Sequence, residues 1–220
     1  MIYEANIFVC LSAPLLIAVF LLRGEARRFT GFFILGLAAC FLSGYINGYL
    51  TVAAAQNGAV SMTAAQSLIR LTPICEETLK AMPVLLFAAL YKPKQRDIIT
   101  VSVGVGLGFA TLENICYILQ YGAEELFFIL IRGFAAGIMH TICAVILGYG
   151  LAVALKHRRF TFTGSFAALC AATTFHAIYN LLVSADGFWQ VLGYLLPIAA
   201  ALAILFLMRR RGKGADAKLE

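Results

Sequence analysis

The segment PICEETLKAMP, which begins at Pro73, places two carboxylates and an ammonium inside an otherwise apolar stretch, 67–91. The stretch is long enough to span a bilayer, which takes about 20 residues of helix. A single charge at the bilayer centre costs at least roughly 3 kcal/mol, so intramembrane ionisable residues indicate a functional site. The group of Glu76, Glu77 and Lys80 therefore constrains this chain more than any other feature of its sequence.

Composition indicates a multi-pass protein of the cell membrane. Of the 220 residues, 62% are hydrophobic and 13% are charged, whereas soluble domains are about one quarter charged. Apolar runs of about 20 residues predict seven transmembrane helices. Their predicted ranges are 6–22, 30–55, 67–91, 98–121, 126–155, 165–184 and 188–208. We therefore expect an all-α, polytopic membrane helix bundle, with residues 1–220 as a single transmembrane domain.

The basic residues predict the orientation of the bundle. Of the 17 Lys and Arg residues, 14 follow the first, third, fifth and seventh predicted helices. None lies in the loops predicted at 56–66, 122–125 and 185–187. By the positive-inside rule, this pattern puts the N-terminus outside and the C-terminus, with the basic tail 209–220, in the cytoplasm. Because the positive charge is spread over these loops, it does not indicate a nucleic-acid partner.

Further polar residues fall inside the predicted helices. They are Glu113 and Asn114 in 98–121, Arg132 and His140 in 126–155, and His176 and Asn180 in 165–184. With a helical rise of about 1.5 Å per residue, one glutamate or histidine on each of four helices lies roughly 12–21 Å deep. These four residues are Glu76, Glu113, His140 and His176. Their common depth predicts one active site within the membrane.

Helical spacing predicts how these residues meet. Glu76 and Lys80 are four residues apart and can pair, while Glu77 is turned about 100° away. His176 and Asn180 have the same spacing and offer donors to a single point, as stabilisation of an oxyanion requires.

Three residues are expected to support the site. Lys80 is expected to neutralise a neighbouring glutamate, and Arg132 to pair with Glu113, Glu77 or the outer headgroups. Asn114 is expected to link helices through hydrogen bonds.

Proline and glycine predict local features of the helices. Pro73, one turn before the glutamates, is expected to kink or loosen its helix. The alternate glycines from Gly104 to Gly108 predict close approach to a neighbouring helix. Gly44 and Gly48 predict close packing within the chain, with a dimer seam as the alternative.

Carboxylates beside imidazoles in a water-accessible cavity are suited to hydrolysis, because a buried glutamate can take a proton from water and deliver it to a leaving amine. The sequence has no HExxH motif, and it suggests neither a serine nor an aspartyl mechanism. Zinc is an alternative, with Glu113, His140 and His176 as ligands and an open fourth position. Because carboxylates outnumber good zinc ligands, we expect a site without a metal cofactor.

Four motifs follow one another on successive predicted helices: EExxK from Glu76, FxxxEN from Phe109, the mid-membrane His140, and HxxxN from His176. In this order, residues 67–184 resemble the PrsW family of intramembrane proteases. They are similar more distantly to the CAAX prenyl protease and bacteriocin-processing superfamily, whose pattern is EExxxR, FxxxH and HxxxN.

The resemblance implies a polytopic protease that makes the first cut in a membrane-spanning anti-sigma factor and so releases a stress-response sigma factor. The residues implied as catalytic are Glu76, Glu77, Glu113, His140, His176 and Asn180. By analogy with the CAAX branch, Glu76 would activate water, with Glu77 in support. Glu113 stands where that branch has a histidine, and His176 with Asn180 would form the oxyanion site.

Two rival functions stay open. A proton-coupled transporter also uses intramembrane glutamates and histidines, although no inverted repeat is evident. An inactive membrane scaffold would keep the motifs for stability. The expected partners are the lipid bilayer and a membrane-spanning protein substrate, cut near its extracytoplasmic side. An anti-sigma factor, a prenylated tail and a peptide precursor all stay open as substrates, and the oligomeric state is open too.

Overall fold

The computed structural model describes residues 2–56, 71–121, 126–157 and 160–216. Within them the chain forms seven helices and no strand. The helices are α1 (Ile2–Leu21), α2 (Gly24–Gln56), α4 (Thr72–Tyr91), α5 (Gln95–Tyr121), α6 (Leu126–Lys156), α7 (Thr161–Val183) and α8 (Phe188–Asp216). Each predicted range corresponds to one helix, which confirms the all-α membrane bundle.

Helix length and composition explain this architecture. A backbone in hydrocarbon must satisfy its own hydrogen bonds, so apolar segments of this length form helices. Five helical segments in the described part of the chain are long and apolar enough to cross a membrane. They are Gly24–Ala53, Gln95–Gln120, Leu130–Lys156, Thr161–Val183 and Phe188–Phe206. α4 is not among them, and it is the helix that carries Glu76, Glu77 and Lys80.

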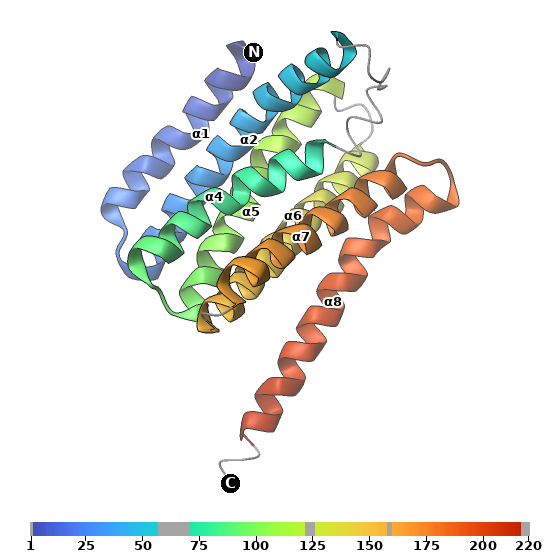
Figure 1. The fold of residues 1–220 in the computed structure, drawn as a ribbon. Helices are drawn as coiled ribbons and strands as arrows, with labels where there is room; N and C mark the ends of the chain where they lie inside the picture. Colours follow the sequence, from blue (N-terminus) through green and yellow to red (C-terminus); the bar gives the residue numbers. More distant parts are fainter. Residues whose placement is uncertain (1, 57–70, 122–125, 158–159, 217–220) are drawn as a thin grey trace.

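The helices alternate in direction along the bundle (Figure 1). The junction of α1 with α2, the junction of α4 with α5, and the ends of α6 and α8 lie toward the lower end in Figure 1. These are the connections rich in basic residues, so the topology agrees with the alternation that the sequence predicts. An external N-terminus and a single domain over 1–220 stay predictions. The predicted loop at 122–125, most of that at 56–66, and the first residues of the predicted helix 67–91 lie outside the described residues.

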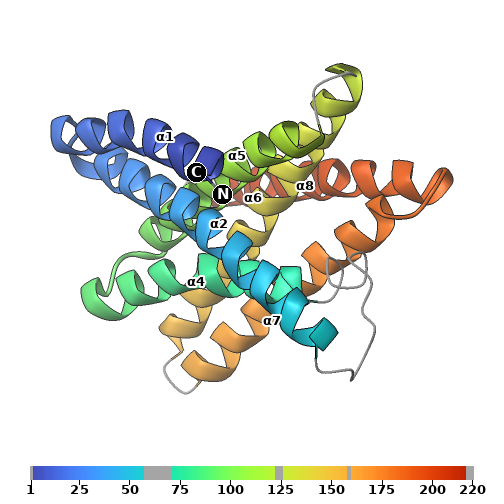
Figure 2. The ribbon, with the colours of Figure 1, turned by 90° about the horizontal axis from the view of Figure 1, so that it is seen from above.

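Helix α4 buries its charged face against four other helices. It contacts α2, α5, α6 and α7, and Figure 2 shows it between α2 and α7. Glu76, Glu77 and Lys80 are consequently only 5%, 1% and 2% exposed. The charges therefore face protein groups, which is how intramembrane charges are tolerated.

Pro73 begins α4 and does not kink it. Leu71 is the N-cap and Pro73 lies in the first turn of a helix that continues to Tyr91. A proline costs little there, because first-turn N–H groups have no acceptor within the helix. The expectation of a kink at Pro73 is therefore wrong.

Glycines allow α5 to approach two neighbours at once. A Cβ on Gly36 of α2 would overlap the Val105 carbonyl of α5, and one on Gly108 would overlap the Phe33 carbonyl of α2. A Cβ on Gly106 would lie 2.6 Å from the Cβ of Ala144 on α6. The predicted close approach of the alternate glycines is confirmed.

The glycines Gly44 and Gly48 differ from this pattern. A Cβ on either would meet nothing within 4 Å. The close packing expected of them is therefore not found among the described residues.

We predict that Gly108→Ala destabilises the bundle by about 1–3 kcal/mol or more, because the added methyl overpacks the crossing of α2 and α5. Thermal unfolding in detergent measures the effect. Gly31→Ala is the matched control, since a Cβ on Gly31 of α2 also meets nothing within 4 Å. Equal melting temperatures for the two variants would contradict the assigned crossing.

Candidate active site

Lys80 lies at the centre of a buried polar cluster. Its Nζ donates to Glu77 Oε1 at 2.6 Å and lies 2.8 Å from His140 Nδ1. The ammonium also lies 4.6 Å from the centre of the Phe109 ring. The sequence left open whether Lys80 neutralises Glu76 or Glu77. The structure pairs it with Glu77, because residues three apart are also neighbours on a helix and His140 approaches on that side.

These contacts assign the hydrogens on both histidines. An ammonium only donates, so His140 Nδ1 accepts from Lys80. His140 Nε2 then carries the hydrogen and donates it to Glu113 Oε2, 2.8 Å away. His176 Nδ1 donates to Glu77 Oε1 at 2.8 Å, which leaves a lone pair on Nε2 when the ring carries a single hydrogen.

Arg132 holds the other side of Glu113. Its Nη2 lies 3.7 Å from Glu113 Oε1, and its Nη1 donates to Asn114 Oδ1 at 2.7 Å. The guanidinium lies 3.6 Å from the centre of the Tyr117 ring. Asn114 Nδ2 donates to the Gly133 carbonyl at 3.2 Å and so links α5 to α6. The partners of Arg132 and Asn114 are among those that the sequence predicts.

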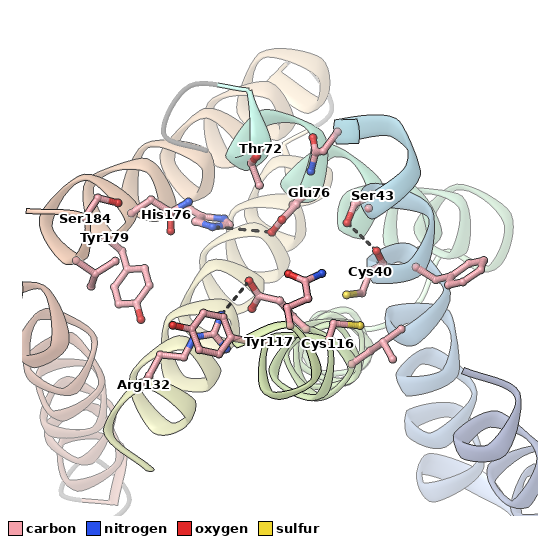
Figure 3. A pocket seen from close by; sticks show the side chains of 18 of the residues that line it. Cys40, Ser43, Thr72, Glu76, Cys116, Tyr117, Arg132, His176, Tyr179 and Ser184 are labelled. Atoms are coloured by element: carbon pink, nitrogen blue, oxygen red, sulfur yellow. Dashed lines mark hydrogen bonds and ion pairs between the residues drawn. The ribbon is translucent and has the colours of Figure 1, made fainter. Parts of the chain in front are cut away.

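A cavity of about 610 Å³ opens beside this cluster (Figure 3). Of the residues expected at the site, five line it: Glu76, Glu113, Arg132, His176 and Asn180. Glu77, Lys80 and His140 do not line it and are almost fully buried. The structure therefore separates a layer of side chains that face the cavity from a buried layer that holds them.

The sequence did not single out the tyrosines of this cavity. Tyr117, Tyr179 and Tyr194 line it from α5, α7 and α8. Tyr117 is four residues after Glu113 and Tyr179 is three after His176, so helical spacing places both on the faces that carry the site. Tyr194 offers no comparable signal, because α8 carries none of the motifs.

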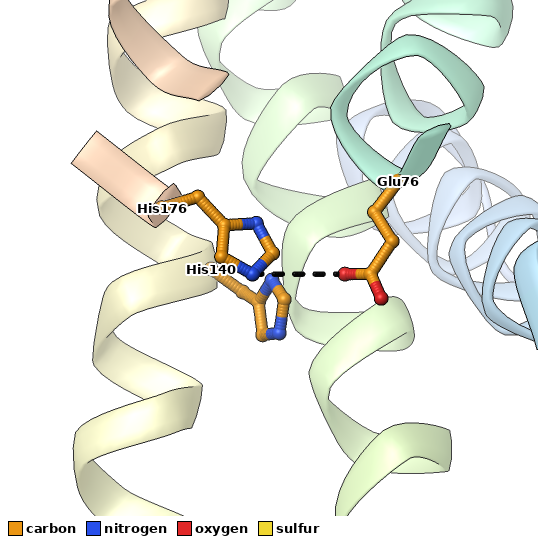
Figure 4. A group of neighbouring side chains, drawn as sticks. All are labelled: Glu76, His140 and His176. Atoms are coloured by element: carbon orange, nitrogen blue, oxygen red, sulfur yellow. Dashed lines mark ion pairs between the residues drawn. The ribbon is translucent and has the colours of Figure 1, made fainter. Parts of the chain in front are cut away.

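Glu76, His140 and His176 form a group that can hold a metal ion. One ligand atom from each lies within 4.8 Å of the others, and Figure 4 shows the three side chains converging from α4, α6 and α7. A carboxylate and two imidazoles are the ligands of many catalytic zinc sites. Glu77 behind His176 adds the hydrogen-bonded carboxylate that commonly orients a histidine ligand.

The unpartnered atoms of the group also fit a cation. Glu76 Oε2 is buried and has no hydrogen-bond partner among the described residues. It lies 3.9 Å from His176 Nε2, whose lone pair is left by the bond to Glu77. Two facing acceptors repel each other unless a cation or a proton donor lies between them.

This group differs from the zinc ligands considered from the sequence. Glu76 takes the place of Glu113, whose Oε2 instead accepts from His140. Both ring nitrogens of His140 already have protein partners, Lys80 and Glu113. A metal at this histidine would therefore replace its contact with one of them.

We predict that Lys80→Met destabilises the protein by about 3–5 kcal/mol, because Glu77 would stay buried without its cation. The double variant Glu77→Gln, Lys80→Met should recover much of this loss. Unfolding in detergent measures both, with the exposed Lys94→Met as the control. If the loss of stability in the double variant equalled the sum of the losses in Lys80→Met and in Glu77→Gln, Lys80 and Glu77 would not be coupled.

Comparison with known proteins identifies the family. A sequence model of the PrsW family intramembrane metalloproteases matches residues 25–208. Protease PrsW of Oceanobacillus iheyensis is 30% identical over 113 residues, which are 51% of this chain and 50% of that relative. The match thus spans half the length of the relative. No solved structure matches the chain. The chain belongs to the PrsW family, which is described as a family of intramembrane metalloproteases.

Proposed function

We propose that this protein hydrolyses peptide bonds of membrane-embedded polypeptides, in the cavity beside Glu76. The observation that carries the proposal is the convergence of Glu76, His140 and His176 inside a membrane bundle, with Glu76 and His176 lining the cavity. Hydrolysis within a bilayer needs such a polar, sheltered space, since the surrounding hydrocarbon holds no water. The family description and the name of the relative support the same activity.

We propose further that Glu76, His140 and His176 hold a zinc ion. When bound, zinc would supply Lewis-acid polarisation of the scissile carbonyl. Glu77 would orient His176, as its hydrogen bond does in the structure, and Lys80 would hold Glu77 in place. This assignment favours the zinc-dependent alternative over the metal-free site expected from the sequence.

Glu113 is our candidate for general acid and base. Its carboxylate lines the cavity, accepts a hydrogen bond from His140 and lies 3.7 Å from Arg132. These two donors fix its orientation. From this position Glu113 can take a proton from water and return it to the leaving amine.

Asn180 is our candidate for the oxyanion donor. It lines the cavity from α7, one helical turn after His176. Its side-chain amide can donate to a negative charge that develops on the scissile carbonyl oxygen. The sequence analysis assigned the oxyanion site to His176 and Asn180 together. Because His176 would act as a metal ligand, Asn180 alone would donate to the oxyanion.

For the substrate we propose a membrane-spanning regulator such as an anti-sigma factor. This choice rests on the resemblance of the motifs to the family. The bonds to be cut would lie within or next to the membrane, because Glu76 and His176 belong to the interior of the bundle.

We predict that Glu76→Gln lowers the cleavage rate at least about 100-fold, because a neutral amide can neither act as a base nor serve as a good zinc ligand. The measurement is hydrolysis of fluorescein-labelled β-casein, an unfolded polypeptide, by purified protein in detergent. Glu25→Gln is the control, since Glu25 is a half-exposed glutamate on α2 away from the cavity.

A chelator separates the two mechanisms. Loss of cleavage with a zinc chelator and recovery with added zinc would support the metal site. Cleavage that survives the chelator but is lost in Glu76→Gln would instead support water activated by Glu76 alone. A wild-type protein that neither cleaves casein nor binds zinc would contradict the proposed protease.

A further inference from the structure

One wall of the cavity has no role in the proposed chemistry. α2 contributes Cys40, Ser43, Gly44 and Asn47 to the lining. Figure 3 shows Cys40 and Ser43 on the side of the cavity opposite His176 and Tyr179. We call Ser43, Gly44 and Asn47 the α2 wall.

The α2 wall is open, whereas α2 is tightly packed against α5 around Gly36. Gly36 on the same helix is in backbone contact with α5, whereas a Cβ on Gly44 would meet no atom of the described residues within 4 Å. A glycine that no neighbouring helix requires still permits close approach of another backbone. Since Gly44 borders the cavity, that backbone can belong to a molecule inside it.

Two buried acceptors around this cavity lack a donor. Asn47 Oδ1 on α2 and Glu76 Oε2 on α4 are buried and have no hydrogen-bond partner among the described residues. Glu76 is 5% exposed, and both residues line the cavity. A buried acceptor without a partner costs roughly 1–3 kcal/mol. Glu76 has a place in the proposed metal site, whereas Asn47 is left needing a donor.

An extended polypeptide can supply the hydrogen-bond donor that Asn47 lacks. A substrate segment that is unwound for cleavage loses its helical hydrogen bonds, and at membrane depth its N–H groups must find acceptors on the enzyme. Asn47 offers an acceptor, and Gly44 offers a surface without a side chain. On the other walls, Tyr117, Tyr179 and Tyr194 offer rings against which substrate side chains can pack.

We propose that the α2 wall is the subsite for the substrate backbone. An extended polypeptide segment next to the scissile bond lies with its main chain against Gly44 and donates an N–H to Asn47 Oδ1. The ligand class is thus an unwound peptide, bound through its backbone and not through a particular side chain. This inference rests on the proposed function, because it takes the molecule in the cavity to be the substrate.

The test compares Gly44→Leu with Gly31→Leu. Both glycines lie on α2 and both have room for a Cβ, but only Gly44 lines the cavity. Two readouts are used: the KM for cleavage of fluorescein-labelled β-casein, and the Kd of the same probe for proteins that also carry Glu76→Gln. We expect Gly44→Leu to raise both constants about tenfold or more, Gly44→Ala to have a smaller effect, and Gly31→Leu to have none. Asn47→Leu should also raise the Kd. Melting temperatures establish that each variant folds.

The outcomes separate this inference from the proposed function. If the wild type cleaves casein and Gly44→Leu behaves like Gly31→Leu, the α2 wall is not the subsite, although the protease stands. If the wild type does not cleave, but the Glu76→Gln protein binds casein and Gly44→Leu weakens that binding, the subsite stands and the protease does not. Absence of both cleavage and binding overturns both.

Discussion

The ion pair between Lys80 and Glu77 is the interaction on which the rest of the site depends. Both side chains are at most 2% exposed, and their charged atoms are 2.6 Å apart. An unpaired charge at this depth would cost several kcal/mol. Pairing alone leaves hydrogen-bonding capacity unused on both groups, and His140 and His176 take part of it. The pair thus ties α4 to α6 and α7 through two imidazoles.

This arrangement leaves Glu76 directed at the cavity. Because Glu77 takes the lysine, the neighbouring carboxylate keeps an oxygen without a hydrogen-bond partner in the described structure. The hydrogen bond from His176 Nδ1 to Glu77 turns the other ring nitrogen toward that oxygen. The two adjacent glutamates therefore differ in their contacts, since Glu77 holds Lys80 and His176 and Glu76 faces the cavity. A like division between supporting and reacting carboxylates is common where proteins bind metals.

The sequence predicted the helices and most of the side chains that the structure brings together at the candidate site, because both depend on local patterns. Apolar length gives the spans, and depth along each helix brings Glu76, Glu113, His140 and His176 to one layer. Local patterns did not determine which glutamate forms the ion pair with Lys80. Spacings of three and four residues both allow a pair, and the choice is made by histidines on two other helices. Pro73 was misread for a related reason, since its effect depends on where the helix begins.

Sequence patterns did not predict which residues of α2 and α8 line the cavity. A glycine pair such as Gly44 and Gly48 has the same spacing whether it packs against a helix or borders a space. Only the three-dimensional arrangement shows that α5 crosses α2 at Gly36 and leaves the region of Gly44 open. Likewise, Tyr194 enters the site from α8, a helix without any of the motifs. These features follow from how helices far apart in the sequence meet.

We propose that Glu76, His140 and His176 form a metal site behind which Glu77, paired with Lys80, fixes His176. An anomalous difference map from zinc-loaded crystals, recorded on both sides of the zinc absorption edge, tests it most directly. The account predicts one strong peak in contact with Glu76, His140 and His176, with His176 Nδ1 still bonded to Glu77. A peak held by Glu113 in place of Glu76, or no peak at this cluster, would contradict it.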